Sequence, residues 1–189
     1  FTLLFLAGGL TPGPAVMLVT TASIRYGFWA AMIPAIGICV ANLVWIALAA
    51  SGVAVLAKAF PDAFLVLKAA GIAFIVWLAW KTAFGPPVDL LRTEPPPRRK
   101  LFLHGIGLQL AHPNALVYFG GLLPTYFNPD HDMIPQVLIS MATVTVCEMF
   151  GLVVYAAGSD ALAWRFQSQS FAHWFFRIAA LAMVISAVF

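Results

Sequence analysis

Two short motifs place prolines and polar residues inside long apolar stretches, where the backbone itself can bind a ligand. Thr11-Pro12-Gly13-Pro14 lies in the first such stretch, and His112-Pro113-Asn114 lies in the fourth. Proline lacks the N–H that a helix needs, so each motif should interrupt a helix. The freed backbone groups then need a partner in protein or in a water-filled cavity. Both motifs are candidate substrate-binding sites, and packing kinks without a ligand are the alternative.

Glu148 is a carboxylate well inside an apolar stretch, with Cys147 and Met149 as its neighbours. An ionised carboxylate in such surroundings is costly, so the group either takes up a proton or pairs with a cation. Either state can do chemistry, because the carboxyl can carry a proton or bind the amine of a ligand. A protonated side chain that only bonds a neighbouring helix is the alternative.

Asn42 and His112 are further polar residues with apolar surroundings. The Asn42 amide can hydrogen-bond a ligand or hold two helices together. His112 can face a ligand or relay a proton, and a structural histidine beside a helix break is the alternative. Gln109 precedes His112 by about one helical turn and is placed to share its face.

No pattern of residues predicts a metal centre. Asp130-His131-Asp132 is better explained as the cap of the following helix than as a ligand set. The two cysteines, Cys39 and Cys147, lie in apolar runs without metal-ligand spacing, so we expect small buried hydrophobic side chains. We predict no metal, no other cofactor and no catalytic residue.

The elements that must position these residues follow from the composition. The chain is 62% hydrophobic and 9% charged, against about 45–50% and about 25% in soluble domains. So few charged residues cannot cover a water-facing surface. The composition excludes a soluble enzyme and a disordered regulator, and the net charge of +3 is too small for a nucleic-acid binder.

The apolar residues form runs of the length that crosses a membrane, which is roughly 20 residues. The chain begins at Phe1, so we expect some residues to precede it. We predict an all-α membrane protein with six transmembrane helices, of which the first and fourth are broken. The expected segments are 2–24, 28–57, 62–84, 101–127, 133–158 and 170–189.

The stretch 85–100, rich in proline and arginine, is the expected linker between a first three-helix repeat at 1–84 and a second at 101–189. The halves align with Asn42 opposite Glu148, and Ala50-Ser51-Gly52 opposite Ala156-Ala157-Gly158. A three-helix unit crosses the membrane an odd number of times, so its copy must insert upside down. We therefore predict inverted repeats, an arrangement common in secondary transporters.

The basic residues predict the orientation, because cytoplasmic loops carry an excess of lysine and arginine. With six spans, one side collects most of them, and the other holds only Lys58 and Lys68. The first side should be cytoplasmic, with the linker on it. Its residues are Arg25, Lys81, Arg92, Arg98, Arg99, Lys100, Arg165 and Arg177.

These motifs resemble those of the lysine exporter (LysE)/RhtB family. The matching residues are Thr11-Pro12-Gly13-Pro14, Gly37-x4-Asn42-Leu43-Val44-Trp45, Leu67-Lys68-x2-Gly71-x5-Trp77-Leu78-x-Trp80-Lys81, Phe102-x2-Gly105, His112-Pro113-Asn114-Ala115-Leu116 and Leu122-Leu123-Pro124. The resemblance implies six helices and proton-coupled efflux of amino acids across the bacterial inner membrane. The family's fourth-helix motif reads Asn-Pro-Lys, and many members carry an acid in place of Asn42. Glu148 is the candidate for that acidic role.

The predicted function is a secondary exporter of small amino acids or related metabolites. Substrate would bind between the broken helices, with its carboxylate at backbone N–H groups near Gly13 and Asn114. Glu148, with Asn42 opposite, would bind the amine or carry the coupling proton. The alternatives are a small-ion or metal exporter, a membrane-embedded enzyme and a structural scaffold. The expected partners are a small molecule and the lipid bilayer, not nucleic acid, and a homodimer is left open.

Overall fold

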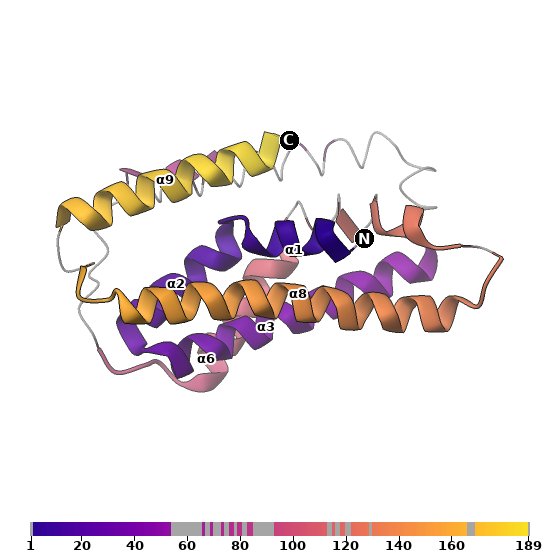
Figure 1. The fold of residues 1–189 in the computed structure, drawn as a ribbon, viewed down its shortest axis with the longest axis horizontal. Helices are drawn as coiled ribbons and strands as arrows, with labels where there is room; N and C mark the ends of the chain where they lie inside the picture. Colours follow the sequence, from indigo (N-terminus) through magenta and orange to yellow (C-terminus); the bar gives the residue numbers. More distant parts are fainter. Residues whose placement is uncertain are drawn as a thin grey trace.

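The protein is described here by a computed structural model, in which the placed residues form helices and turns (Figure 1). The structure describes residues 2–53, 93–112, 122–128, 130–165 and 169–188, with the isolated residues 66, 69, 73, 76, 77, 79, 80, 83, 84, 115, 118 and 119. Within these residues no β-strand occurs. The all-helical prediction is confirmed for this part of the chain.

The first apolar segment is two helices rather than one. Helix α1 runs over Thr2–Leu10 and helix α2 over Pro14–Tyr26. Pro14 stands in the first turn of α2, where a missing N–H costs little. The predicted break in the first helix is therefore confirmed, and it falls at residues 11–13.

Helix α3 runs over Phe28–Leu48 and continues into a π-helical turn, η1, at Ala49–Val53. Gly27 joins α2 to α3 with φ of 87°, a left-handed conformation that a side chain disfavours. This one-residue connection turns the chain back, so α2 and α3 pack side by side. The expected third segment, 62–84, lies mostly outside the described residues, as do Lys58, Lys68, Lys81 and Arg92.

Helix α6 runs over Arg98–Leu110 and begins earlier than the sequence predicted. The expected linker 85–100 therefore ends at Pro97. Backbone N–H groups of Lys100 and Leu101 bond the Pro97 carbonyl, at 2.8 and 3.3 Å, so the basic residues form the first helical turn. A short 3₁₀ helix, η3, follows at Leu123–Tyr126.

Helix α8 runs over Met133–Ala161, and helix α9 over Gln169–Val188. Two stretches of the described residues, Phe28–Ser51 and Met133–Ala161, are long and apolar enough to cross a membrane. With 29 residues, α8 is about 43 Å long at 1.5 Å per residue, which exceeds a hydrocarbon core of about 30 Å. The six-helix inverted repeat remains a prediction.

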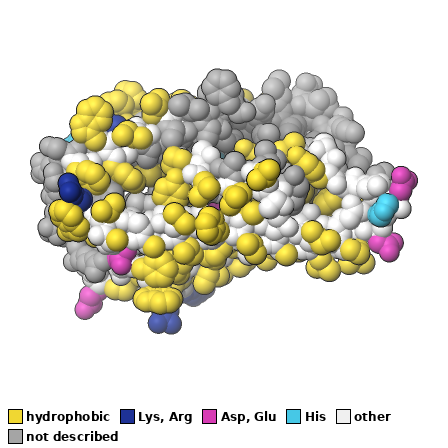
Figure 2. All heavy atoms as spheres, viewed as in Figure 1, with side chains coloured by type: hydrophobic (Ala, Val, Ile, Leu, Met, Phe, Trp, Pro, Cys, Tyr) yellow, Lys and Arg dark blue, Asp and Glu magenta, His cyan; other side chains and the backbone are white. Residues whose placement is uncertain are grey.

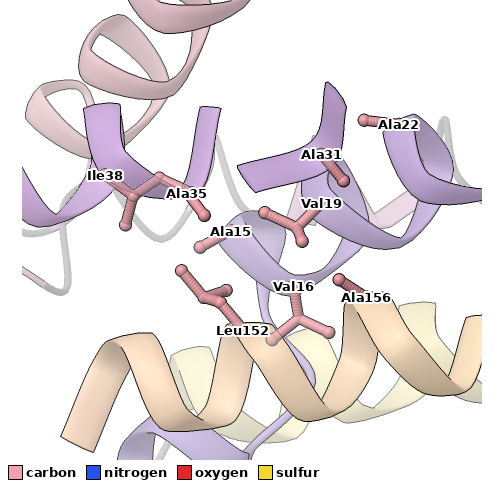
Figure 3. Close-up of a cluster of buried hydrophobic side chains, with 9 residues drawn as sticks. All are labelled: Ala15, Val16, Val19, Ala22, Ala31, Ala35, Ile38, Leu152 and Ala156. Atoms are coloured by element: carbon pink, nitrogen blue, oxygen red, sulfur yellow. The ribbon is translucent and has the colours of Figure 1, made fainter. Parts of the chain in front are cut away.

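The core lies where α2, α3 and α8 meet, and Figure 3 shows side chains of the three helices pointing toward one another. All but two of its residues are alanine or valine, and such small side chains let helices approach closely. The cluster is Ala15, Val16, Val19, Ala22, Ala31, Ala35, Ile38, Leu152 and Ala156. Helix α9 joins this bundle through Phe175 and Phe176, which pack against Ile24 and Met17 of α2.

Two helix pairs are so close that glycine is required at the contact. A Cβ atom added to Gly105 of α6 would lie 2.9 Å from the Pro34 Cα of α3, and one on Gly37 would lie 3.1 Å from the Ile106 nitrogen. In the other pair, a Cβ on Gly9 of α1 would lie 3.0 Å from the Cys147 carbonyl oxygen of α8. These contacts fix α6 on α3 and α1 on α8.

The visible basic side chains gather toward one end of the molecule (Figure 2). The Thr93 N–H bonds the Arg25 carbonyl at 3.0 Å, which places the end of α2 beside the residues that lead into the basic first turn of α6. Figure 2 shows the visible lysine and arginine side chains toward the left of the view, together with some acidic side chains, and further acidic side chains with a histidine at the right tip. Helix α8 begins at that tip, directly after Asp130-His131-Asp132 (Figure 1).

Candidate functional site

The break between α1 and α2 exposes backbone groups that a continuous helix would use internally. Gly13 is extended, with φ of −113° and ψ of −173°. Thr11 donates its N–H to the Gly8 carbonyl at 3.0 Å, and Gly13 accepts from the Met17 N–H at 3.0 Å. The carbonyl of Leu10, the last residue of α1, accepts a 2.8 Å hydrogen bond from the Tyr155 hydroxyl of α8. A side chain from another helix thus bonds the backbone at the end of α1, next to the break.

The second break begins where α6 ends at Leu110. Ala111 lies in a turn, and His112 leaves the helix while its N–H donates to the Gln109 carbonyl at 3.2 Å. The same carbonyl accepts the Trp45 indole N–H at 3.2 Å. The helix break predicted at His112 is found, whereas Pro113 and Asn114 lie outside the described residues.

A buried amide pair stands beside this second break. Gln109 donates from Nε2 to the Oδ1 atom of Asn42 at 2.7 Å, joining α6 to α3. Asn42 is 1% exposed and Gln109 is 7% exposed. The Oε1 atom of Gln109 is buried and has no hydrogen-bond partner among the described residues, and the same holds for Nδ1 of His112. The site therefore offers two buried groups that can still bond a ligand.

Glu148 lies on α8 and is half-buried. Helix α1 packs directly against this part of α8, since a Cβ on Gly9 would lie 3.4 Å from the Glu148 Cα. Helix α8 also packs against α3, which carries Cys39 and Asn42. Cys39 precedes Asn42 by three residues, so the two lie on neighbouring turns of one helical face. Helix α3 thus packs against the helix that carries Glu148 and also carries Asn42 of the amide pair.

The structure divides the predicted site residues into two groups. Asn42 and His112 meet through Gln109 at the second break, and Thr11-Pro12-Gly13-Pro14 forms the first break, near Glu148. The predicted pairing of Asn42 with Glu148 across the site is not tested by any contact described here. Within the described part of the chain, no three His, Cys, Asp or Glu side chains gather closely enough to share a metal ion.

Trp45 and Tyr155 have clear roles in this geometry and were not predicted, whereas Gln109 was expected only to share the face of His112. The sequence does indicate the two acceptors of these hydrogen bonds, because Leu10 and Gln109 each precede a motif proline by four residues. In a helix, the carbonyl of residue i accepts from the N–H of residue i+4. The prolines therefore mark these two carbonyls as lacking their usual helical donor, but only the packing identifies Tyr155 and Trp45 as donors from other helices.

The described residues form a helical protein with two helices long and apolar enough to cross a membrane, and with buried hydrogen-bonding groups beside its second helix break. The chain belongs to the LysE type translocator family, whose sequence profile matches residues 6–189.

Several curated relatives are similar over most of the chain. The homoserine/homoserine lactone efflux protein of Salmonella typhi is 28% identical over 157 residues, 82% of this chain and 76% of the relative. The cysteine/O-acetylserine efflux protein of Salmonella choleraesuis is 29% identical over 182 residues, 95% of this chain and 89% of the relative. A protein of the latter name from Escherichia coli O1:K1 / APEC is 30% identical over 148 residues, 78% and 74% of the two chains. No solved structure gives a significant match.

Proposed function

We propose that this protein is a secondary exporter of small amino acids or related metabolites. The observation that carries the proposal is membership of a translocator family over nearly the whole chain, together with relatives named as efflux proteins. The helix breaks support it, because paired broken helices form substrate sites in many secondary transporters.

The substrate class follows from the chemistry of the site. The amides of Asn42 and Gln109 carry no net charge, so they suit a substrate whose side chain is small and uncharged. Homoserine, cysteine and O-acetylserine, which appear in the names of the relatives, share that property. Free N–H groups at the start of α2, after the extended Gly13, suit the substrate carboxylate.

Coupling to protons is assigned to Glu148. Glu148 is half-buried on α8, its Cα lies against Gly9 near the first break, and α8 packs against α3. A carboxyl group in such a place can be protonated when the site faces one side of the membrane and release its proton on the other. Alternating access would come from rocking of the two inverted three-helix repeats.

The membrane and the orientation follow from the family resemblance and the charges. The end that holds Arg25 and the first turn of α6 is the proposed cytoplasmic face of a bacterial inner membrane. The loop with Asp130 and Asp132 would then face the periplasm. Arg177, which we counted with the cytoplasmic loops, lies inside α9.

Glu148→Gln should abolish proton-driven transport while keeping substrate exchange. Glutamine has the shape of a protonated glutamate but cannot release a proton. Purified protein in proteoliposomes should therefore exchange labelled substrate for unlabelled substrate at close to the parental rate, yet should not accumulate it when a pH gradient is imposed. Glu94→Gln, on an exposed residue before α6, is the matched control and should behave as the parent.

The outcomes separate the roles open to Glu148. Loss of both accumulation and exchange, in a variant that still folds, would indicate that the Glu148 carboxylate binds the substrate amine. Full accumulation in the variant would contradict any coupling role for Glu148, and another group would have to carry the proton.

A further inference from the structure

Two aromatic side chains, one on α3 and one on α8, bond the two helix breaks in the same way. The Tyr155 hydroxyl of α8 donates to the Leu10 carbonyl at 2.8 Å, and the Trp45 indole N–H of α3 donates to the Gln109 carbonyl at 3.2 Å. Each accepting carbonyl stands at or next to the last residue of a helix that ends in a break. The two bonds therefore serve corresponding points of the two broken helices.

The sequence explains why these carbonyls lack the hydrogen bond of a continuous helix. In a continuous helix, Leu10 would accept from the N–H of residue 14, and Gln109 from that of residue 113. Both of those residues are prolines, Pro14 and Pro113, and have no N–H to give. The Gln109 carbonyl also accepts the His112 N–H at 3.2 Å, from the turn that ends α6. A donor from a neighbouring helix adds a hydrogen bond at each carbonyl that has lost its helical donor, and so stabilises the break.

The two donors occupy equivalent positions of α3 and α8. They are separated by 155 − 45 = 110 residues. The same spacing relates the burial of the two helices, because each buried residue of α8 has a buried counterpart 110 positions earlier. The pairs are Ala30 and Ser140, Pro34 and Val144, Gly37 and Cys147, Ala41 and Gly151, Asn42 and Leu152, Ile46 and Ala156, and Ala49 and Ser159.

This register differs by four residues, about one helical turn, from the sequence alignment that placed Asn42 opposite Glu148. In this register Trp45 of α3 aligns with Tyr155 of α8. Apolar helices resemble one another, so the sequence alone does not distinguish registers that differ by one turn. The pattern of buried residues does distinguish them.

We infer that Trp45 and Tyr155 are a symmetry-related pair of positioning residues, each of which fixes one of the two broken helices at the transport site. The inference rests on the proposed function for its consequence in transport. Neither residue is assigned a contact with substrate. Each acts through the backbone of the break, whose freed N–H groups are proposed to bind the substrate.

The test removes each donor, then exchanges the two. Tyr155→Phe and Trp45→Phe delete the hydrogen bond and keep an aromatic ring. Tyr155→Trp and Trp45→Tyr restore a donor with the side chain of the other site. Tyr118→Phe and Trp29→Phe are the matched controls, on side chains that are 38% and 82% exposed.

The expected result is a several-fold rise in the apparent KM for a transported amino acid in each of the two donor-free variants, up to about tenfold for one hydrogen bond. The amount of folded protein should stay at the parental level. The exchanged variants should recover part of the loss, and the controls should match the parent. A role in packing alone would lower the yield of folded protein and leave KM unchanged.

Amide hydrogen exchange gives a readout that does not depend on transport. Exchange should rise around Thr11 and Gly13 in Tyr155→Phe, and around Ala111 and His112 in Trp45→Phe, with little change elsewhere. If the parent moves no amino acid but exchange rises at these places, the proposed function fails and the inference stands. If the parent transports and the donor-free variants change neither KM nor local exchange, the inference is overturned.

Discussion

Gly105→Ala should leave most of the protein unable to fold, whereas Gly107→Ala, in the same helix, should be tolerated. A Cβ at position 105 would lie 2.9 Å from the Pro34 Cα and carbonyl carbon, and backbone atoms in a helix cannot move aside. Forcing extra atoms into a packed contact costs about 1–3 kcal/mol, and more where the neighbour is rigid. Nothing lies within 4 Å of the same atom at position 107. The yield of monodisperse protein in detergent and its midpoint of thermal unfolding measure the difference.

The reciprocal contact supplies a second variant. Gly37→Ala places its Cβ 3.1 Å from the Ile106 nitrogen and close to the Phe102 carbonyl, so it should fail in the same way. Equal thermal midpoints for the Gly105 and Gly107 variants would show that α3 and α6 do not pack as described here. The amide pair that depends on this contact between α3 and α6 would then not be formed as described.

Gln109→Leu should reduce transport by roughly ten- to a hundredfold, because a buried polar group left without its partner costs about 1–3 kcal/mol. Leucine removes the donor that bonds Asn42 Oδ1 at 2.7 Å and also the buried Oε1, which has no partner among the described residues. Uptake of labelled amino acid into proteoliposomes, normalised to folded protein, measures the loss.

The double variant Asn42→Leu with Gln109→Leu separates stability from function. Replacing both partners of a buried hydrogen bond by apolar groups can leave the stability nearly unchanged. Replacing only one leaves the other buried without a partner, which is destabilising. The double variant should therefore unfold at a higher temperature than either single variant, yet it should still fail to transport. A double variant that regained both stability and transport would show that the amide pair only holds α3 to α6.

The part of the site that depends on proline chemistry could be predicted from the sequence. Pro12 and Pro14 stand on either side of Gly13 and both lack the N–H of a continuing helix, so the break at residues 11–13 could be predicted from the residue types. A single proline does not suffice, because Pro34 lies inside α3. The helical class and the position of α8 were predictable for a similar reason. Long apolar runs without charge have few alternatives to a helix that crosses a membrane.

The partners across the breaks could not be predicted, because they depend on the rotation and depth of one helix against another. Gln109 meets Asn42 only because Gly37 and Gly105 let α6 approach α3 so closely. The sequence holds both glycines, but many other glycines in this chain could have made such a contact. Gly8 and Gly107 look equivalent in the sequence and face open space in the structure.

The start of α6 was missed for a different reason. Arg98, Arg99 and Lys100 follow a run of prolines, so charge and proline together suggested a linker. Arginine and lysine are good helix formers, however, and the Pro97 carbonyl accepts the first helical hydrogen bonds. The helix therefore begins in the basic residues and places its first turn at the end of the molecule where Arg25 lies.

The central claim is that this protein moves small amino acids against a gradient, and transport in proteoliposomes tests it most directly. The purified protein would be reconstituted into vesicles with an acidic lumen and offered labelled homoserine, cysteine, O-acetylserine and lysine in turn. Proton antiport predicts that at least one of the first three accumulates inside above its external concentration, and that a protonophore abolishes the accumulation. If none of the four accumulates in vesicles that contain folded protein, the account of an amino-acid exporter is contradicted.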